Sequence, residues 1–167
     1  MEVKIPETKL QEAASKGTDA FLTLVHDCIL DAVGGDVNAE TLPLLNGEQT
    51  TLLAYFILRD EVMDGGFIQL IHNGYGPFIF LNPFAKAMRL WGAQDFSKLV
   101  YKGRKLFEQY GDVLQAECTD DEFMALFEQY PDFDELDDAF IEMEEEVTDT
   151  IAHYVDENLE KFVSIGS

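Results

Sequence analysis

Three residues near the middle of the chain, Glu61, Asp64 and His72, have side chains that could act as acids, bases or metal ligands. Carboxylates and imidazoles do this chemistry when they converge in one pocket, where burial and neighbouring charges shift their pKa values. These three lie close together in the sequence, on either side of Gly65-Gly66. They are therefore the candidate site for one hypothesis, an enzyme or a metal-dependent hydrolase. A single histidine at a helix end is more often a hydrogen-bonded cap, so this hypothesis is the alternative.

Other motifs for catalysis or cofactor binding do not fit the sequence. Gly65-Gly66 and the glycines of residues 74–76 lack the lysine and the spacing of a phosphate-binding loop. A loop that starts at Asp132 like a calcium site has Asp137 where an EF-hand needs glycine. No histidine has the partner of a zinc motif; the three are His26, His72 and His153. We expect no cofactor, no bound metal and no catalytic residue.

Carboxylates are the commonest ionisable groups of the chain, and they are concentrated in its C-terminal part. There are 33 acidic residues against 11 lysines and arginines, which gives a formal net charge of −22. Twenty of the acids lie between Glu108 and Glu160, a stretch without any lysine or arginine. Helix surfaces usually mix both signs, because opposite charges four residues apart stabilise the helix. This charge repels phosphate, so the sequence predicts cationic partners and no direct binding to nucleic acid or membranes.

The last predicted helix, from about Asp134 to about Phe162, carries acids on one side only. With about 100° per residue, its apolar residues fall within an arc of roughly 80° and most of its acids within roughly 140° on the opposite side. We call the acidic side the acidic face. Its candidate protein-binding residues are Glu135, Asp138, Glu142, Glu145, Glu146, Asp149, Asp156 and Glu157.

The charge density of this helix is close to that of a DNA strand. The twelve acids from Asp134 to Glu160 lie along ~40 Å of helix axis, about one per 3.3 Å. One strand of B-DNA carries a charge about every 3.4 Å. Two other interpretations stay open. The acidic face could be solvated surface with no other role, or the basic residues between Lys86 and Lys105 could pair with it, internally or across a dimer.

Helical periodicity dominates the whole chain and predicts an all-α fold with six to eight helices in a single domain, residues 1–167. The expected helices run over about 18–33, 46–62, 67–72, 83–91, 95–110, 120–130 and 134–162. Residues 78–81 form the only strand-like segment. The helix boundaries come from glycines and from capping residues, including Asn46 and a capping box at Thr119.

The segment Glu61-Val62-Met63-Asp64-Gly65-Gly66-Phe67-Ile68-Gln69, followed by Asn73-Gly74, predicts a helix end, a two-glycine turn and a new helix start. Glu61, Gln69 and Asn73 are close enough in sequence to cap the backbone groups exposed at the break. We interpret the motif as structural. Its residues are Glu61, Gly65, Gly66, Phe67, Gln69 and Asn73.

This segment resembles the Glu-Val-x-Asn-Gly-Gly-Phe-x-Gln…Asn signature of the bacterial DNA-mimic protein family, whose members are small, acidic, helical and mostly uncharacterised. Asp64 stands where the family usually has Asn. The likeness covers about residues 45–160 and includes the helix end at Trp91-Gly92-Ala93. It implies an all-helical homodimer. In the best-known member, acids arranged like duplex phosphates occupy the DNA-binding surface of a helix-turn-helix repressor.

The leading hypothesis is a non-enzymatic protein whose acidic face binds a basic protein, with a DNA-binding transcription regulator as the candidate that the resemblance implies. Two isolated cysteines, Cys28 and Cys118, are typical of a reducing cytoplasm. No apolar run approaches the ~20 residues that span a bilayer. A purely structural domain, or an accessory domain of a toxin system, is a further alternative.

Overall fold

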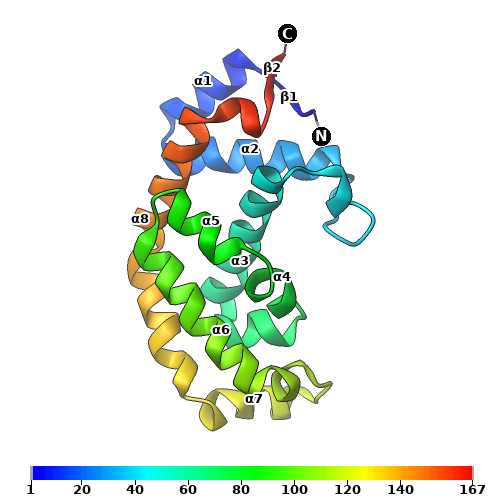
Figure 1. Ribbon diagram of the computed structural model, residues 1–167, viewed down its shortest axis with the longest axis vertical. Coiled ribbons are helices and arrows are strands. Elements are labelled where there is room, and N and C mark those ends of the chain that lie inside the picture. The colour runs from blue at the N-terminus through cyan, green and yellow to red at the C-terminus, as the bar shows by residue number, and fades with distance from the viewer. Residues whose placement is uncertain (1, 167) are drawn as a thin grey trace. The chain divides into compact units, whose positions relative to one another are not determined.

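The structure, a computed structural model, describes residues 2–166 and confirms the all-α fold class (Figure 1). Within these residues it has eight α-helices: α1 (Glu7–Ser15), α2 (Thr18–Ala32), α3 (Gly47–His72), α4 (Gly76–Phe80), α5 (Phe84–Leu90), α6 (Gln94–Gln115), α7 (Asp120–Gln129) and α8 (Asp132–Glu157). Two short 3-10 helices cover Leu42–Leu44 and Leu159–Lys161. Strands β1 (Lys4–Pro6) and β2 (Ser164–Gly166) pair in parallel.

The described residues form two compact units. The first unit contains the chain up to Phe56 together with the chain from Glu146 onwards, and the second contains Ile57–Glu145. Both α3 and α8 therefore supply residues to each unit. That residues 1–167 form one domain stays a prediction.

The first unit is organised around the start of α3. Asn46 caps this helix as predicted: its Oδ1 accepts a hydrogen bond from the Gln49 backbone N–H at 2.8 Å. The Gln49 side chain, which is buried, donates from Nε2 to the Phe162 carbonyl at 2.8 Å. One turn and a half further on, the Tyr55 hydroxyl is 2.6 Å from Thr148 Oγ1 of α8. These buried polar contacts join segments about a hundred residues apart in the sequence, among them α3 and the C-terminal part of α8.

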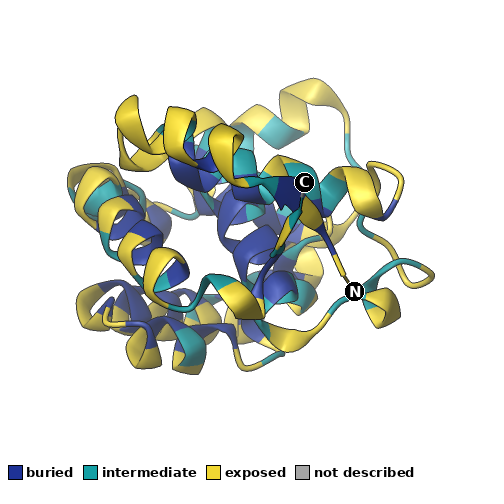
Figure 2. Cartoon of the chain, turned by 90° about the horizontal axis from the view of Figure 1, so that it is seen from above, coloured by how far each residue is buried: buried dark blue, intermediate teal, exposed yellow. Residues whose placement is uncertain are grey.

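The second unit has an aromatic core. Its largest buried side chains include Phe67, Phe80, Phe84, Phe96, Phe133 and Phe140. The rings of Phe80 and Phe107 lie 5.4 Å apart, and those of Phe96 and Phe140 lie 5.6 Å apart. Aromatic pairs at these distances stabilise a core beyond the area they bury. Figure 2 shows individual helices with exposed residues along one side and buried residues along the other.

Several predicted boundaries are confirmed and several elements differ. Thr119 and Glu122 form the predicted capping box, with both hydrogen bonds present at 3.2 Å. The strand-like segment 78–81 does not form a strand, because residues 76–80 form helix α4. The sequence signal was ambiguous, since short apolar runs occur in buried strands and in buried helices alike. Helix α6 continues past its predicted end, since Gly111 lies inside the helix against the Phe107 ring. Helix α1 and the two strands were not predicted.

Candidate functional site

Helix α8 follows Pro131 and has acids in its first turn, Asp132, Asp134 and Glu135, where the helix dipole favours negative charge. Its apolar side is buried as the sequence predicts. Phe133, Leu136 and Phe140 pack in the second unit, and Val147, Ile151 and Val155 pack in the first. This burial fixes the rotation of the helix and turns the opposite side towards solvent.

All eight predicted residues of the acidic face are exposed. In the second unit these are Glu135, Asp138, Glu142 and Glu145. In the first unit they are Glu146, Asp149, Asp156 and Glu157. Within the described part of each unit, none of them forms an ion pair with a lysine or an arginine.

The basic residues between Lys86 and Lys105, all in the second unit, form no ion pair with Glu135, Asp138, Glu142 or Glu145, the acidic-face residues of that unit. Arg104 pairs instead with Glu108 one turn away on α6, with Nε 3.1 Å from Oε1. Among the described residues of the second unit, Glu135, Asp138, Glu142 and Glu145 thus carry uncompensated charge. The internal pairing that the sequence left open is absent from this unit.

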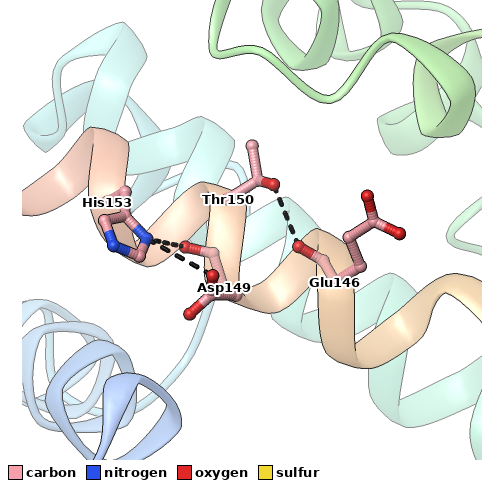
Figure 3. Close-up of polar contacts among 4 residues, drawn as sticks. All are labelled: Glu146, Asp149, Thr150 and His153. Carbon is pink, nitrogen blue, oxygen red and sulfur yellow. Dashed lines mark hydrogen bonds and ion pairs between the residues drawn. The ribbon is translucent and has the colours of Figure 1, made fainter.

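Among the described residues of the first unit, His153 is the one ionisable base on the acidic face of α8 (Figure 3). Its Nδ1 donates a hydrogen bond to the Asp149 carbonyl oxygen at 2.8 Å and lies 3.5 Å from the Asp149 carboxylate. The backbone hydrogen bond and the charges of Asp149, Glu157 and Asp156 raise the pKa of His153 above its ordinary value. Figure 3 also shows the Thr150 hydroxyl donating to the Glu146 carbonyl at 2.9 Å. The charge of this part of the face therefore depends on pH.

Two acids of α8, Asp137 and Glu144, do not belong to the acidic face, and no role was predicted for either from the sequence. Asp137 Oδ1 accepts a hydrogen bond at 2.8 Å from the backbone N–H of Phe67, where α3 restarts after its break. Glu144 Oε1 lies 3.7 Å from Arg59 of α3, and both side chains are largely buried. Both acids lie at the edge of the apolar stripe of α8, seven positions apart. Their place next to the buried side of the helix is the sequence signal that could have predicted their contacts with α3.

Burial raises the pKa of Asp137 to about 6, and the charges of Asp134 and Asp138 act in the same direction. The amide of Phe67 opposes this shift, because its hydrogen bond favours the charged carboxylate. Asp137 is thus a cap for the second part of α3, supplied by another helix.

The glycine motif is built around this cap. Gly66 has φ 78° and ψ −178°, a conformation that is essentially restricted to glycine. A Cβ atom at Gly66 would lie 2.8 Å from Cγ of Asp137. The motif's polar side chains bond to one another instead of capping the backbone: Gln69 Nε2 donates to Glu61 at 2.8 Å and to Asp64 at 3.0 Å, and Asn73 Nδ2 donates to Glu61 at 3.0 Å.

The candidate enzyme residues are only partly brought together. Gln69 joins Glu61 and Asp64, whereas His72 Nδ1 donates to the Leu114 carbonyl at 2.8 Å and its ring lies 4.7 Å from that of Phe123. Across residues 2–166, no three His, Cys, Asp or Glu side chains form a group that could hold a metal ion. In the same part of the chain, none of the helices has the length and apolar character needed to cross a bilayer.

Two comparisons relate this chain to known proteins. A protein-family model described as DMP19-like protein matches residues 43–158, which include α3 to α8. A relative from Neisseria meningitidis serogroup B (strain ATCC BAA-335 / MC58), named DNA mimic protein DMP19, is 36% identical over 128 residues. The aligned region covers 76% of this chain and 78% of the relative. The glycine motif and the acidic face both lie within the range that the family model matches.

Proposed function

Because the chain belongs to the family of DMP19-like proteins, we propose that its acidic face binds the basic surface of a DNA-binding protein in place of DNA. This membership confirms the resemblance to the DNA-mimic protein family that was seen in the sequence. The protein is non-enzymatic. In this proposal the partner is a transcription regulator, and the protein acts in the cytoplasm as a homodimer. The glycine motif has a structural role.

One observation carries the proposal: the eight acids are exposed and have no lysine or arginine partner within the described part of their units. DNA-binding surfaces hold phosphates with arginine and lysine side chains, which fix the position of the protein on the duplex. Carboxylates accept the same charge-assisted hydrogen bonds from guanidinium and ammonium groups as phosphates do. An acidic face without internal partners can therefore offer its acceptors to a surface built for DNA.

The proposal is tested by capturing partners from a bacterial lysate with three forms of the protein. The first is the unchanged protein. The second neutralises four acids of the acidic face: Glu135→Gln, Asp138→Asn, Glu142→Gln and Glu145→Gln. The third is a matched control with the same change in charge at other exposed positions: Asp31→Asn, Asp36→Asn, Glu40→Gln and Asp112→Asn.

We expect the unchanged protein and the control to retain a DNA-binding protein that the acidic-face variant loses. Salt should elute this partner as the concentration rises from 50 to 200 mM, because contacts between exposed charges are screened. Partners that survive high salt, or that bind all three forms equally, would show that the acidic face is not the binding surface.

A further inference from the structure

The basic residues of α5 and α6 have no role in the proposed mimicry of DNA. Six of the chain's eleven lysines and arginines lie between Lys86 and Lys105, and Asp95 is the one acid among them. All six are exposed. In a chain with a net charge of −22, such a concentration of positive charge in one part of the second unit calls for a separate explanation.

A cavity of about 190 Å³ opens among these residues, between α4, α5 and α6. Its floor is apolar and comes from buried residues, chiefly Phe80, Ala85 and Val100. Its polar rim is formed by Lys86, Tyr101 and Arg104, with Asn82 and Pro83 completing the lining. The cavity thus combines an apolar base with two cationic side chains and a hydroxyl group.

The rim groups differ in their availability to a ligand. The Asn82 amide is already used: its Nδ2 donates to the Phe78 carbonyl and its Oδ1 accepts from the Phe84 N–H at 3.0 Å. Lys86 and the Tyr101 hydroxyl have no hydrogen-bond or ion-pair partner among residues 2–166. Arg104 uses only Nε, towards Glu108, so the remaining N–H groups of its guanidinium can donate elsewhere.

We propose that this cavity binds a small organic carboxylate, with its apolar part on the floor and its carboxylate between Lys86, Tyr101 and Arg104. These three side chains offer only charge-assisted or hydroxyl donors, which an anionic oxygen accepts best. The cavity is smaller than the 300–1,000 Å³ typical of sites for drug-sized ligands, so a single ring or a short chain fits it. This site is independent of the acidic face and does not rest on the proposed mimicry.

The overall negative charge of the protein does not prevent such binding. At physiological ionic strength the Debye length is ≈ 8 Å, so acids further away than this act only weakly on a bound carboxylate. The nearby competitor is Glu108, which holds Nε of Arg104 at 3.1 Å. Removing the Glu108 carboxylate should therefore strengthen the binding of a carboxylate at this rim.

The test uses three probes and nuclear magnetic resonance of the isotope-labelled full chain. Phenylacetate carries a ring and a carboxylate, phenylacetamide carries the same ring without charge, and inorganic phosphate carries charge without an apolar part. We expect phenylacetate to shift amide signals of residues around the cavity, with phenylacetamide and phosphate binding at least tenfold more weakly. Equal binding of either control probe would overturn the proposal.

Variants of the rim sharpen the test. Lys86→Gln and Arg104→Gln should each weaken phenylacetate binding by about tenfold, the loss expected for one charge-assisted hydrogen bond. Tyr101→Phe should weaken it by about threefold. Glu108→Gln should strengthen it, and Lys98→Gln, an exposed base outside the cavity lining, should leave it unchanged. Unaltered affinity in both the Lys86 and the Glu108 variants would refute the assignment.

Discussion

Asp137 shows that neighbouring acids on one helix can have opposite roles. It lies between residues of the acidic face and the apolar stripe, and its carboxylate caps the backbone of Phe67. Asp138, the next residue, is exposed and makes no side-chain hydrogen bond or ion pair among the described residues. Burial raises the pKa of Asp137 to about 6, so this carboxylate is ionised at pH 8, where the cost of its buried charge opposes the stabilisation from the amide hydrogen bond.

Asp137→Ala should lower the free energy of unfolding at pH 5 by about 1 kcal/mol or more, the usual cost of removing a helix cap. At pH 8 the loss should be smaller, because the raised pKa means that the ionised carboxylate destabilises the folded state. The loss at pH 5 could approach about 3 kcal/mol, because the Phe67 N–H would be left without its partner in a buried position. Asp138→Ala is the matched control and should change the free energy of unfolding by less than about 0.5 kcal/mol. Urea unfolding followed by circular dichroism measures the free energy of unfolding of both variants. Equal stabilities for the two variants would contradict the capping role of Asp137.

His153 should titrate above its ordinary range. The hydrogen bond to the Asp149 carbonyl and the charges of Asp149, Glu157 and Asp156 favour the imidazolium, which raises the pKa of His153. Protonation as the pH falls then places a positive charge on the acidic face of the first unit. Binding to a basic partner should therefore weaken as the pH falls through this pKa.

A titration of the His153 ring followed by nuclear magnetic resonance tests this directly. We expect a pKa above 6.5 in the unchanged protein and a lower one in Asp149→Asn, which keeps the carbonyl but removes the charge. A His153 pKa that does not respond to the Asp149 substitution would rule out the electrostatic cause.

At the scale of the elements, the sequence predicted the features that depend on neighbouring residues, namely helix faces, helix starts and helix breaks. The apolar stripe of α8 fixed its exposed face, the Asn46 and Thr119 caps marked two helix starts, and Gly66 marked the break in α3. Interactions between distant segments gave no such signal. The parallel pair of Lys4–Pro6 and Ser164–Gly166 joins the two ends of the described chain, and Asp137 meets Phe67 across 70 positions.

The break in α3 gives a prediction at this scale. Gly66→Ala should destabilise the protein by roughly 1–3 kcal/mol from backbone strain alone, because φ is 78° there, and the new Cβ would also meet the Asp137 carboxylate. Gly47→Ala is the control at the start of the same helix, where a Cβ meets nothing within 4 Å and φ is not positive. It should be neutral or slightly stabilising.

Thermal or urea unfolding of the two glycine variants measures the difference. If Gly66→Ala were as stable as Gly47→Ala, the positive φ and the close approach of Asp137 would not be required for folding. The test concerns the glycine motif only, since neither substitution changes an acid of the acidic face.

At the scale of the whole molecule, a net charge of −22 should oppose folding by self-repulsion. Most of the acids between Glu108 and Glu160 are exposed and the segment has no lysine or arginine. Salt screens this repulsion, so the melting temperature should rise between 20 and 500 mM sodium chloride. The variant with four neutralised acids on the acidic face should show a smaller rise. A melting temperature that falls with salt would mean that attractive ion pairs outweigh the repulsion.

Displacement of DNA is the most direct measure of mimicry. The regulator captured by the unchanged protein is bound to fluorescently labelled operator DNA, and fluorescence anisotropy is followed as the protein is added. We predict that the unchanged protein and the matched control release the DNA, and that the variant with the neutralised acidic face does not. DNA that stays bound, or that the neutralised variant releases equally well, would contradict the role of the acidic face.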